Sequence, residues 1–262
     1  MKIVVCIKQV PGTHDVKIDP VTKRLVREGV EAVINPFDTY ALEQGVLIKE
    51  KVGGEVVALC MGPPNAEKTL REAIGCGADS AVLLSDRAFA GSDTWATSYA
   101  LAQAIRKIGG VGLALFGKQA IDGDTAQVGP GVAAHLDWPQ VTYVSKMSEV
   151  SEAKGSFRRM NEDGYDDIEV DFPAVITVVK DINVPRIPSL KSRMAAKKAE
   201  IPVWTAAMVD ADPAKLGLNG SPTRVVKTFP PAARDAKTMV ITGAPEEMAQ
   251  KLVHEMRLHS LV

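Results

Sequence analysis

Four short apolar runs, rich in valine, isoleucine and leucine, recur along the first half of the chain. They occupy residues 3–7, 55–59, 81–84 and 112–116. Uninterrupted apolar runs of this length are typical of strands that are buried on both faces of a parallel sheet. Because such strands must be covered by helices on both sides, this feature limits the fold to the α/β class.

Segments with helical spacing lie between these runs, and each has a start signal. Asp38 precedes the first helix, Asn65 follows two prolines before the second, and Asp93 precedes the third. The alternation predicts a mostly parallel, doubly wound sheet of the Rossmann or flavodoxin-like kind, with right-handed crossovers. One interruption, residues 16–26, carries a proline-bearing turn and predicts a hairpin inserted after the first strand.

The second half of the chain follows a different pattern. Residues 141–144 and 174–179 are strand-like, and the acidic stretch at residues 161–167 is expected to form a surface turn between them. Residues 202–233 show no sustained periodicity, as expected of an arm lying on a partner. An amphipathic pattern predicts a final helix over residues 245–258.

These patterns divide the chain into two parts. Residues 1–184 are predicted to form the α/β nucleotide-binding domain. Residues 185–262, which begin basic and rich in proline, are predicted to form an extended C-terminal arm that ends in the terminal helix.

Composition excludes several classes of function. The 31 lysines and arginines against 32 acidic residues leave a net charge of -1, which offers no field for a nucleic-acid backbone. The three cysteines form no C-x-x-C pair, so reduced thiols in a cytoplasmic protein are expected rather than disulfides or a metal site. The chain has no uncharged apolar stretch of about 18 residues, so no transmembrane segment is predicted.

No catalytic residue is expected, because the histidines form no constellation with a serine or a cysteine. The strongest signal for a ligand site is instead the loop at residues 117–131, which follows a predicted buried strand and leads into a helix. Its glycines and small polar residues allow backbone N–H groups to approach a phosphate, and the following helix adds its N-terminal dipole. An ordinary tight turn is the alternative, since glycine, aspartate and threonine favour it equally.

Two further loops follow or precede predicted strands and helices at the same edge. Residues 35–38 are either a ligand-binding loop or a helix cap, and residues 61–65 are either a ligand-binding loop or a strand stop before a proline-started helix. A third loop, residues 86–97, is either a ligand-binding loop or an ordinary capped helix start, in which Ser92-Asp93-Thr94 forms the cap and Trp95 lies in the core.

At these loops the sequence resembles the beta subunit of electron-transfer flavoproteins over essentially the whole chain. The matching segments are residues 5–11, 34–38, 61–63, 75–79 and 117–122. In that family the larger, alpha subunit carries a redox-active FAD, and the beta subunit buries an adenine nucleotide that is often AMP.

The resemblance implies a set of cofactor-binding residues. They are Cys6, Asn35, Pro36, Phe37, Asp38, Met61, Gly117, Lys118, Gln119, Ala120, Ile121, Asp122, Gly123, Asp124, Thr125, Ala126, Gln127 and Val128. Arg87 and Thr94, in the third loop, are further candidates for contact with a flavin or a pyrophosphate. Leu190 matches the leucine that anchors the family's docking loop on acyl-CoA or related flavin dehydrogenases, with a solvated basic helix as the alternative.

The largest departure from the AMP-binding pattern lies at Ala126 and Val128, where an N-Q-T-G sequence is typical. Loss of an amide and a hydroxyl removes donors for a terminal phosphate and leaves room for a diphosphate. This version resembles the electron-bifurcating branch, whose beta subunit binds a second FAD that accepts hydride from NADH and whose electrons reach ferredoxin or flavodoxin. The alternatives are a beta subunit holding structural AMP and, from another class, a stand-alone adenine-nucleotide sensor.

Overall fold

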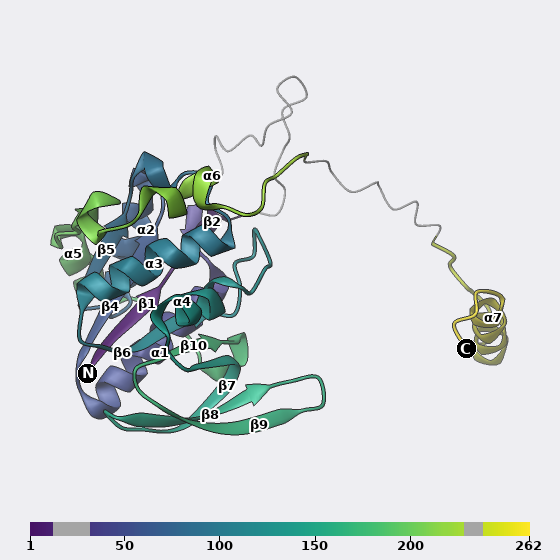
Figure 1. Cartoon of the computed structure of the whole chain (residues 1–262). Helices are drawn as coiled ribbons and strands as arrows, with labels where there is room; N and C mark the ends of the chain where they lie inside the picture. The colour runs from purple at the N-terminus through teal and green to yellow at the C-terminus, as the bar shows by residue number, and fades with distance from the viewer. Residues whose placement is uncertain (13–31, 228–237) are drawn as a thin grey trace. The chain divides into compact units, whose positions relative to one another are not determined.

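The computed structural model describes residues 1–12, 32–227 and 238–262 (Figure 1). Contacts divide the chain into two units, residues 1–224 and residues 225–262. The hairpin predicted at residues 16–26 lies outside the described residues. Residues 185–224, expected in the C-terminal arm, pack within the first unit, whereas the functional division of the chain stays a prediction.

A nine-stranded sheet forms the centre of the first unit, in the order β11-β5-β4-β1-β6-β10-β7-β8-β9. The strands are β1 Lys2–Cys6, β4 Glu55–Met61, β5 Ser80–Leu84, β6 Val111–Gly117, β7 Gln140–Val150, β8 Lys154–Met160, β9 Tyr165–Asp171, β10 Ala174–Val178 and β11 Val203–Trp204. Every pairing from β11 to β7 is parallel, and β8 and β9 add an antiparallel hairpin. The short strands β2 Gln9–Pro11 and β3 Ala32–Ile34 pair separately. The predicted mostly parallel sheet is confirmed.

Helices cover both faces of this sheet. They are α1 Pro36–Val52, α2 Glu67–Gly75, α3 Thr94–Ile108, α4 Val128–Leu136, α5 Leu190–Lys198 and the single turn α6 Gly217–Gly220. Buried residues of α1 and α2 share one hydrophobic cluster, and those of α3 and α4 share the other. Figure 1 shows α3 and α4 in front of the sheet. The sheet is therefore doubly wound.

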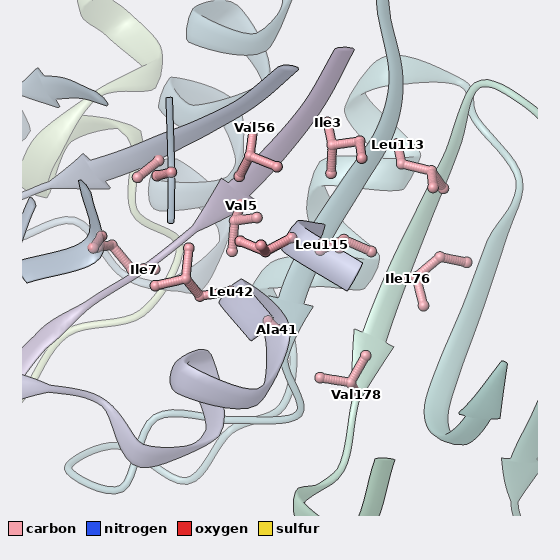
Figure 2. Close-up of a cluster of buried hydrophobic side chains, with 14 of the residues drawn as sticks. Ile3, Val5, Ile7, Ala41, Leu42, Val56, Leu113, Leu115, Ile176 and Val178 are labelled. Atoms are coloured by element: carbon pink, nitrogen blue, oxygen red, sulfur yellow. The ribbon is translucent and has the colours of Figure 1, made fainter. Parts of the chain in front are cut away.

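Strand β1 shows why its sequence is apolar without alternation. Ile3 and Val5 pack in the cluster that contains Leu42 of α1, and Figure 2 shows their side chains in that layer. Val4 and Cys6 point to the opposite cluster, beneath α3 and α4. Since successive side chains alternate between two buried faces, every position of the strand must be apolar.

The chain reverses its direction of winding beside β1. β4 and β5 lie on one side of β1, whereas β6 lies on the other, an order that matches strands 3-2-1-4 of the Rossmann order 3-2-1-4-5-6. In open parallel sheets this reversal leaves a crevice at the carboxyl ends of the two central strands, here β1 and β6.

Two predicted segments differ from the structure. Within the acidic stretch only residues 161–164 form a turn, because Tyr165 already begins β9. Residues 203–216 belong to the core instead of an arm: Ala206, Val209 and Leu216 are buried in the cluster beneath α3. Their periodicity is absent because they form short 3₁₀ turns and a two-residue strand. In the second unit, helix α7 spans Pro245–Leu258, which confirms the predicted bounds.

Candidate nucleotide-binding site

A cavity of about 380 Å³ opens at the switch point of the sheet. Cys6 at the end of β1, Met61 at the end of β4 and Gly117 at the end of β6 line it, as do the first residues of α3 and α4. This volume falls within the range of about 300–1,000 Å³ that is usual for small-molecule sites.

The cavity brings most of the expected site residues together. Lining it are Cys6, Asp38, Met61, Thr94, Gly117, Lys118, Gln119, Ala120, Gly123, Thr125, Ala126, Gln127 and Val128. The expected residues that do not line it are Asn35, Pro36, Phe37, Arg87, Ile121, Asp122 and Asp124. That any of them contacts a cofactor stays a prediction.

Eight lining residues were not among the individually expected site residues, although Gly129 lies in the predicted loop 117–131 and Ser92, Asp93 and Thr97 lie in the predicted loop 86–97. The eight are Ile7, Lys8, Ser92, Asp93, Thr97, Leu101, Phe116 and Gly129. Thr94, Thr97 and Leu101 lie at i, i+3 and i+7 of α3, so the helical period was a signal that could have found the last two. The others adjoin predicted residues in the chain.

Asn35 does not line the cavity but holds the loop that does. It is fully buried, its side-chain amide donates to the Gln119 carbonyl over 2.8 Å, and its side-chain oxygen accepts from the Ile121 N–H over 3.1 Å. Although Asn35 occupies the N-cap position of α1, its side chain makes no capping hydrogen bond. The expected helix-cap role is therefore absent from the side chain, which fixes the loop after β6 instead.

Asp38 joins the ends of the two central strands. Its buried carboxylate accepts hydrogen bonds from the Lys8 N–H over 2.8 Å and from the Gly117 N–H over 3.1 Å. Burial raises the pKa of this carboxyl to about 7, against the opposing effect of those hydrogen bonds. Gly117 must be glycine, because a Cβ there would lie 2.6 Å from the backbone carbon of Phe37.

The loop after β6 is held at several points. Asp124 and Ala126 both adopt a φ of 54°, in the left-handed region. The Gly123 and Asp124 N–H groups both donate to the Ala120 carbonyl, and the Thr94 hydroxyl donates to the Gln127 side chain over 2.9 Å. The loop and the start of α3 thus form one connected rim. Arg87 is an exposed residue at the start of the 3₁₀ turn Arg87–Phe89, and it does not line the cavity.

The two helix N-termini at the cavity differ in how they are capped. The Asp93 carboxylate accepts from the Trp95 and Ala96 N–H groups, which confirms the capping reading of this segment. Trp95 is 51% exposed, so its expected place in the core is wrong; its ring packs outward against His135. At α4, by contrast, the N-cap residue Gln127 makes no side-chain cap.

The docking candidate Leu190 is the first residue of α5 and is 77% exposed. The segment before it is fastened to α1: the Arg186 guanidinium pairs with the buried Glu43 carboxylate over 2.8 Å and also with Glu50. These ion pairs hold the segment before Leu190 against α1, while the Leu190 side chain itself remains exposed. Its contact with a dehydrogenase stays a prediction.

Fold and cavity together define a doubly wound α/β protein with a small-molecule-sized site at its switch point. None of the helices in the described parts of the chain has the length and apolar character needed to span a bilayer. The family model for the electron transfer flavoprotein domain matches residues 22–209. The chain belongs to the electron transfer flavoprotein family, as a beta subunit.

Three relatives illustrate the match. The electron transfer flavoprotein subunit beta of Thermoanaerobacterium thermosaccharolyticum is 50% identical over 263 residues, covering 100% of both chains. The Caffeyl-CoA reductase-Etf complex subunit CarD of Acetobacterium woodii is 46% identical over 258 residues, or 98% of each chain. Protein FixA of Azorhizobium caulinodans is 44% identical over 263 residues, covering 98% of this chain and 94% of the relative.

Proposed function

We propose that this beta subunit holds an FAD in the cavity between β1 and β6 and, paired with an alpha subunit, takes electrons from NADH for flavin-based bifurcation. The observation that carries the proposal is the uncapped N-terminus of α4 at the cavity. The Val128 and Gly129 N–H groups belong to the first helical turn, which leaves them without intrahelical acceptors. Such amides, with the helix dipole behind them, favour a phosphate.

The remaining walls fit the adenosine end of such a ligand. Cys6, Leu101 and Phe116 supply apolar surface, and burial raises the pKa of the Cys6 thiol, so this residue stays a neutral contact. At α3 the Asp93 carboxylate already occupies the first amides. We therefore propose that the phosphates lie at the N-terminus of α4 and that the rest of the ligand extends through the cavity toward α3.

Ala126 and Val128 favour a dinucleotide over AMP. Neither side chain offers a hydrogen-bond donor to a terminal phosphate, and both line the cavity. FAD, when bound, supplies the hydride and single-electron chemistry. The protein's residues bury its adenine, hold its pyrophosphate and keep water from that end of the site.

A dehydrogenase or reductase partner is supported by one relative, whose name places CarD in a caffeyl-CoA reductase complex. We propose an acyl-CoA or related flavin dehydrogenase as partner, docked at Leu190, and ferredoxin or flavodoxin as the second acceptor. The free cysteines support a reducing, cytoplasmic setting for the complex.

The test is to co-express the chain with its alpha subunit, purify the heterodimer, release the nucleotides with acid and count them by chromatography. The proposal predicts two FAD and no AMP per heterodimer. One FAD and one AMP would instead support a beta subunit with a structural nucleotide. A chain that is a stable monomer, binds ATP reversibly and needs no alpha subunit would indicate a nucleotide sensor.

A further inference from the structure

Tyr143 has an unusual backbone conformation near the cavity. Its φ is 58°, in the left-handed region, where a bulky residue is strained. The Tyr143 N–H donates to the hydroxyl of Thr177 over 3.1 Å, and Thr177 is itself buried in β10. The register of β7 against β10 shifts at this point, between Ile176 and Val178, as at a β-bulge. Such an irregularity accounts for the strained conformation and re-aims the tyrosine ring.

The ring is one wall of a cation cage. The Lys118 ammonium lies 5.4 Å from the centroid of the Tyr143 ring and 5.5 Å from that of Phe37. Both distances fall within the range of about 6 Å for cation–π attraction. The Lys118 N–H donates to the Val178 carbonyl over 2.8 Å, which fixes the root of the side chain between the two rings.

The cage holds Lys118 without neutralising it. Among the described residues, no carboxylate forms an ion pair with Lys118, although Lys118 lines the cavity. The other lysine of the lining, Lys8, is paired with Asp122 over 2.7 Å. Aromatic faces orient a cation but leave its charge available, whereas a carboxylate cancels it.

We infer that Lys118 is an electrostatic anchor for the phosphate groups of the bound nucleotide, and that Phe37 and Tyr143 are positioning residues that aim it. This inference rests on the proposed function, and it adds which residue would contact the phosphates and which residues would position it. The alternative is a purely structural lysine that covers two rings with its aliphatic stem.

The test compares ligands with and without phosphate. Nucleotide-stripped heterodimer is titrated calorimetrically with FAD, AMP and adenosine at low and high salt. Lys118→Met should weaken FAD and AMP binding about tenfold or more, as expected for a lost charge-assisted contact, and should leave adenosine binding unchanged. Its binding of FAD and AMP should also depend less on salt. Lys146→Met, an exposed lysine of β7, is the charge-matched control.

A second pair of variants separates the ring from the backbone. Tyr143→Asn keeps the left-handed conformation at lower cost but removes the ring, so AMP binding should weaken several-fold in a folded protein. Tyr143→Phe keeps the ring and should retain the affinity. Tyr165→Asn, at an exposed tyrosine of β9, is the control for the substitution itself.

Three results would contradict the inference. Unchanged AMP binding by Lys118→Met would remove its anchoring role, and an equal loss of adenosine affinity would make Lys118 merely structural. AMP binding by Tyr143→Asn equal to that of the unaltered heterodimer would remove the positioning role. Failure of the unaltered heterodimer to bind any adenine nucleotide would instead overturn the proposed function, and this inference with it.

Discussion

Asn35 reaches across the switch point and hydrogen-bonds Gln119 at 2.8 Å, from the start of α1 to the loop after β6. The same side chain accepts from the Ile121 N–H. The loop that forms the proposed phosphate cradle is therefore set by a buried residue that does not itself line the cavity.

Asn35→Ala should loosen that loop. The substitution leaves the Gln119 carbonyl and the Ile121 N–H without their partner, and an unsatisfied buried group costs about 1–3 kcal/mol. Hydrogen exchange of the Ile121 amide should accelerate correspondingly, and the heterodimer should lose nucleotide. Asn65→Ala, at an exposed asparagine, is the control. Unchanged exchange at Ile121 would show that Asn35 does not hold the loop.

Asp38 should make stability depend on pH. Its folded-state pKa is raised from 3.8 to about 7, so the folded protein binds this proton more tightly than the unfolded chain. The stabilisation is fully present below the unfolded pKa and is lost as pH rises through the folded pKa. The Tm of the heterodimer should therefore fall more between about pH 5 and pH 8 than that of Asp38→Asn. Parallel profiles for the two proteins would refute the shift; Asp137→Asn, at an exposed carboxylate, is the control.

Two glycines of the loop should respond differently to alanine. A Cβ at Gly117 would overlap Phe37 and Asp38, whereas one at Gly123 would meet no atom within 4 Å. Gly117→Ala should lower the Tm by roughly 2–10 °C, because overpacking costs about 1–3 kcal/mol. Gly123→Ala should leave it nearly unchanged. Equal effects in thermal melts would show that the approach of β6 to α1 is looser than described.

The preference of the site for FAD over AMP should depend on the side chains of residues 126 and 128. Ala126→Asn combined with Val128→Thr introduces an amide and a hydroxyl into the cavity lining, both able to bond a terminal phosphate. Asparagine also tolerates the left-handed backbone at position 126, so the fold should be retained. Nucleotide extracted from the double variant should shift from FAD toward AMP. Retention of FAD at the level of the unaltered protein would assign the preference elsewhere.

Leu190→Ala should affect partner exchange alone. Truncating a central apolar anchor costs about 1–2 kcal/mol of binding, so electron exchange with the dehydrogenase should slow about fivefold or more. FAD content should not change, since Leu190 does not line the cavity. Leu47→Ala, at another partly exposed leucine, is the control in stopped-flow measurements. Loss of flavin together with exchange would defeat the docking role.

Patterns governed by neighbours in the chain were predictable. The apolar runs located β1, β4, β5 and β6, and the Asp93 cap located the start of α3. The amphipathic period located α7 with the bounds that it has in the structure. Each depends on local spacing or capping, which a single sequence displays directly. The glycine-rich loop after β6 also lines the cavity as expected.

Features that depend on distant partners were not predictable. The core places of Ala206 and Leu216 follow from packing beneath α3, and strand β11 exists only because Val203 and Trp204 pair with β5. Lys8 lines the cavity and Asn35 does not, and this difference depends on which strand ends meet at the switch point. None of these contacts has a local sequence signature.

Electron density in the cavity of the purified heterodimer tests the central claim most directly. A crystal structure should show adenine near Cys6 and Met61, with phosphate density against the amides of Val128 and Gly129. A loop from Gly117 to Gly129 that packs against protein side chains, with no nucleotide beside it, would contradict the account.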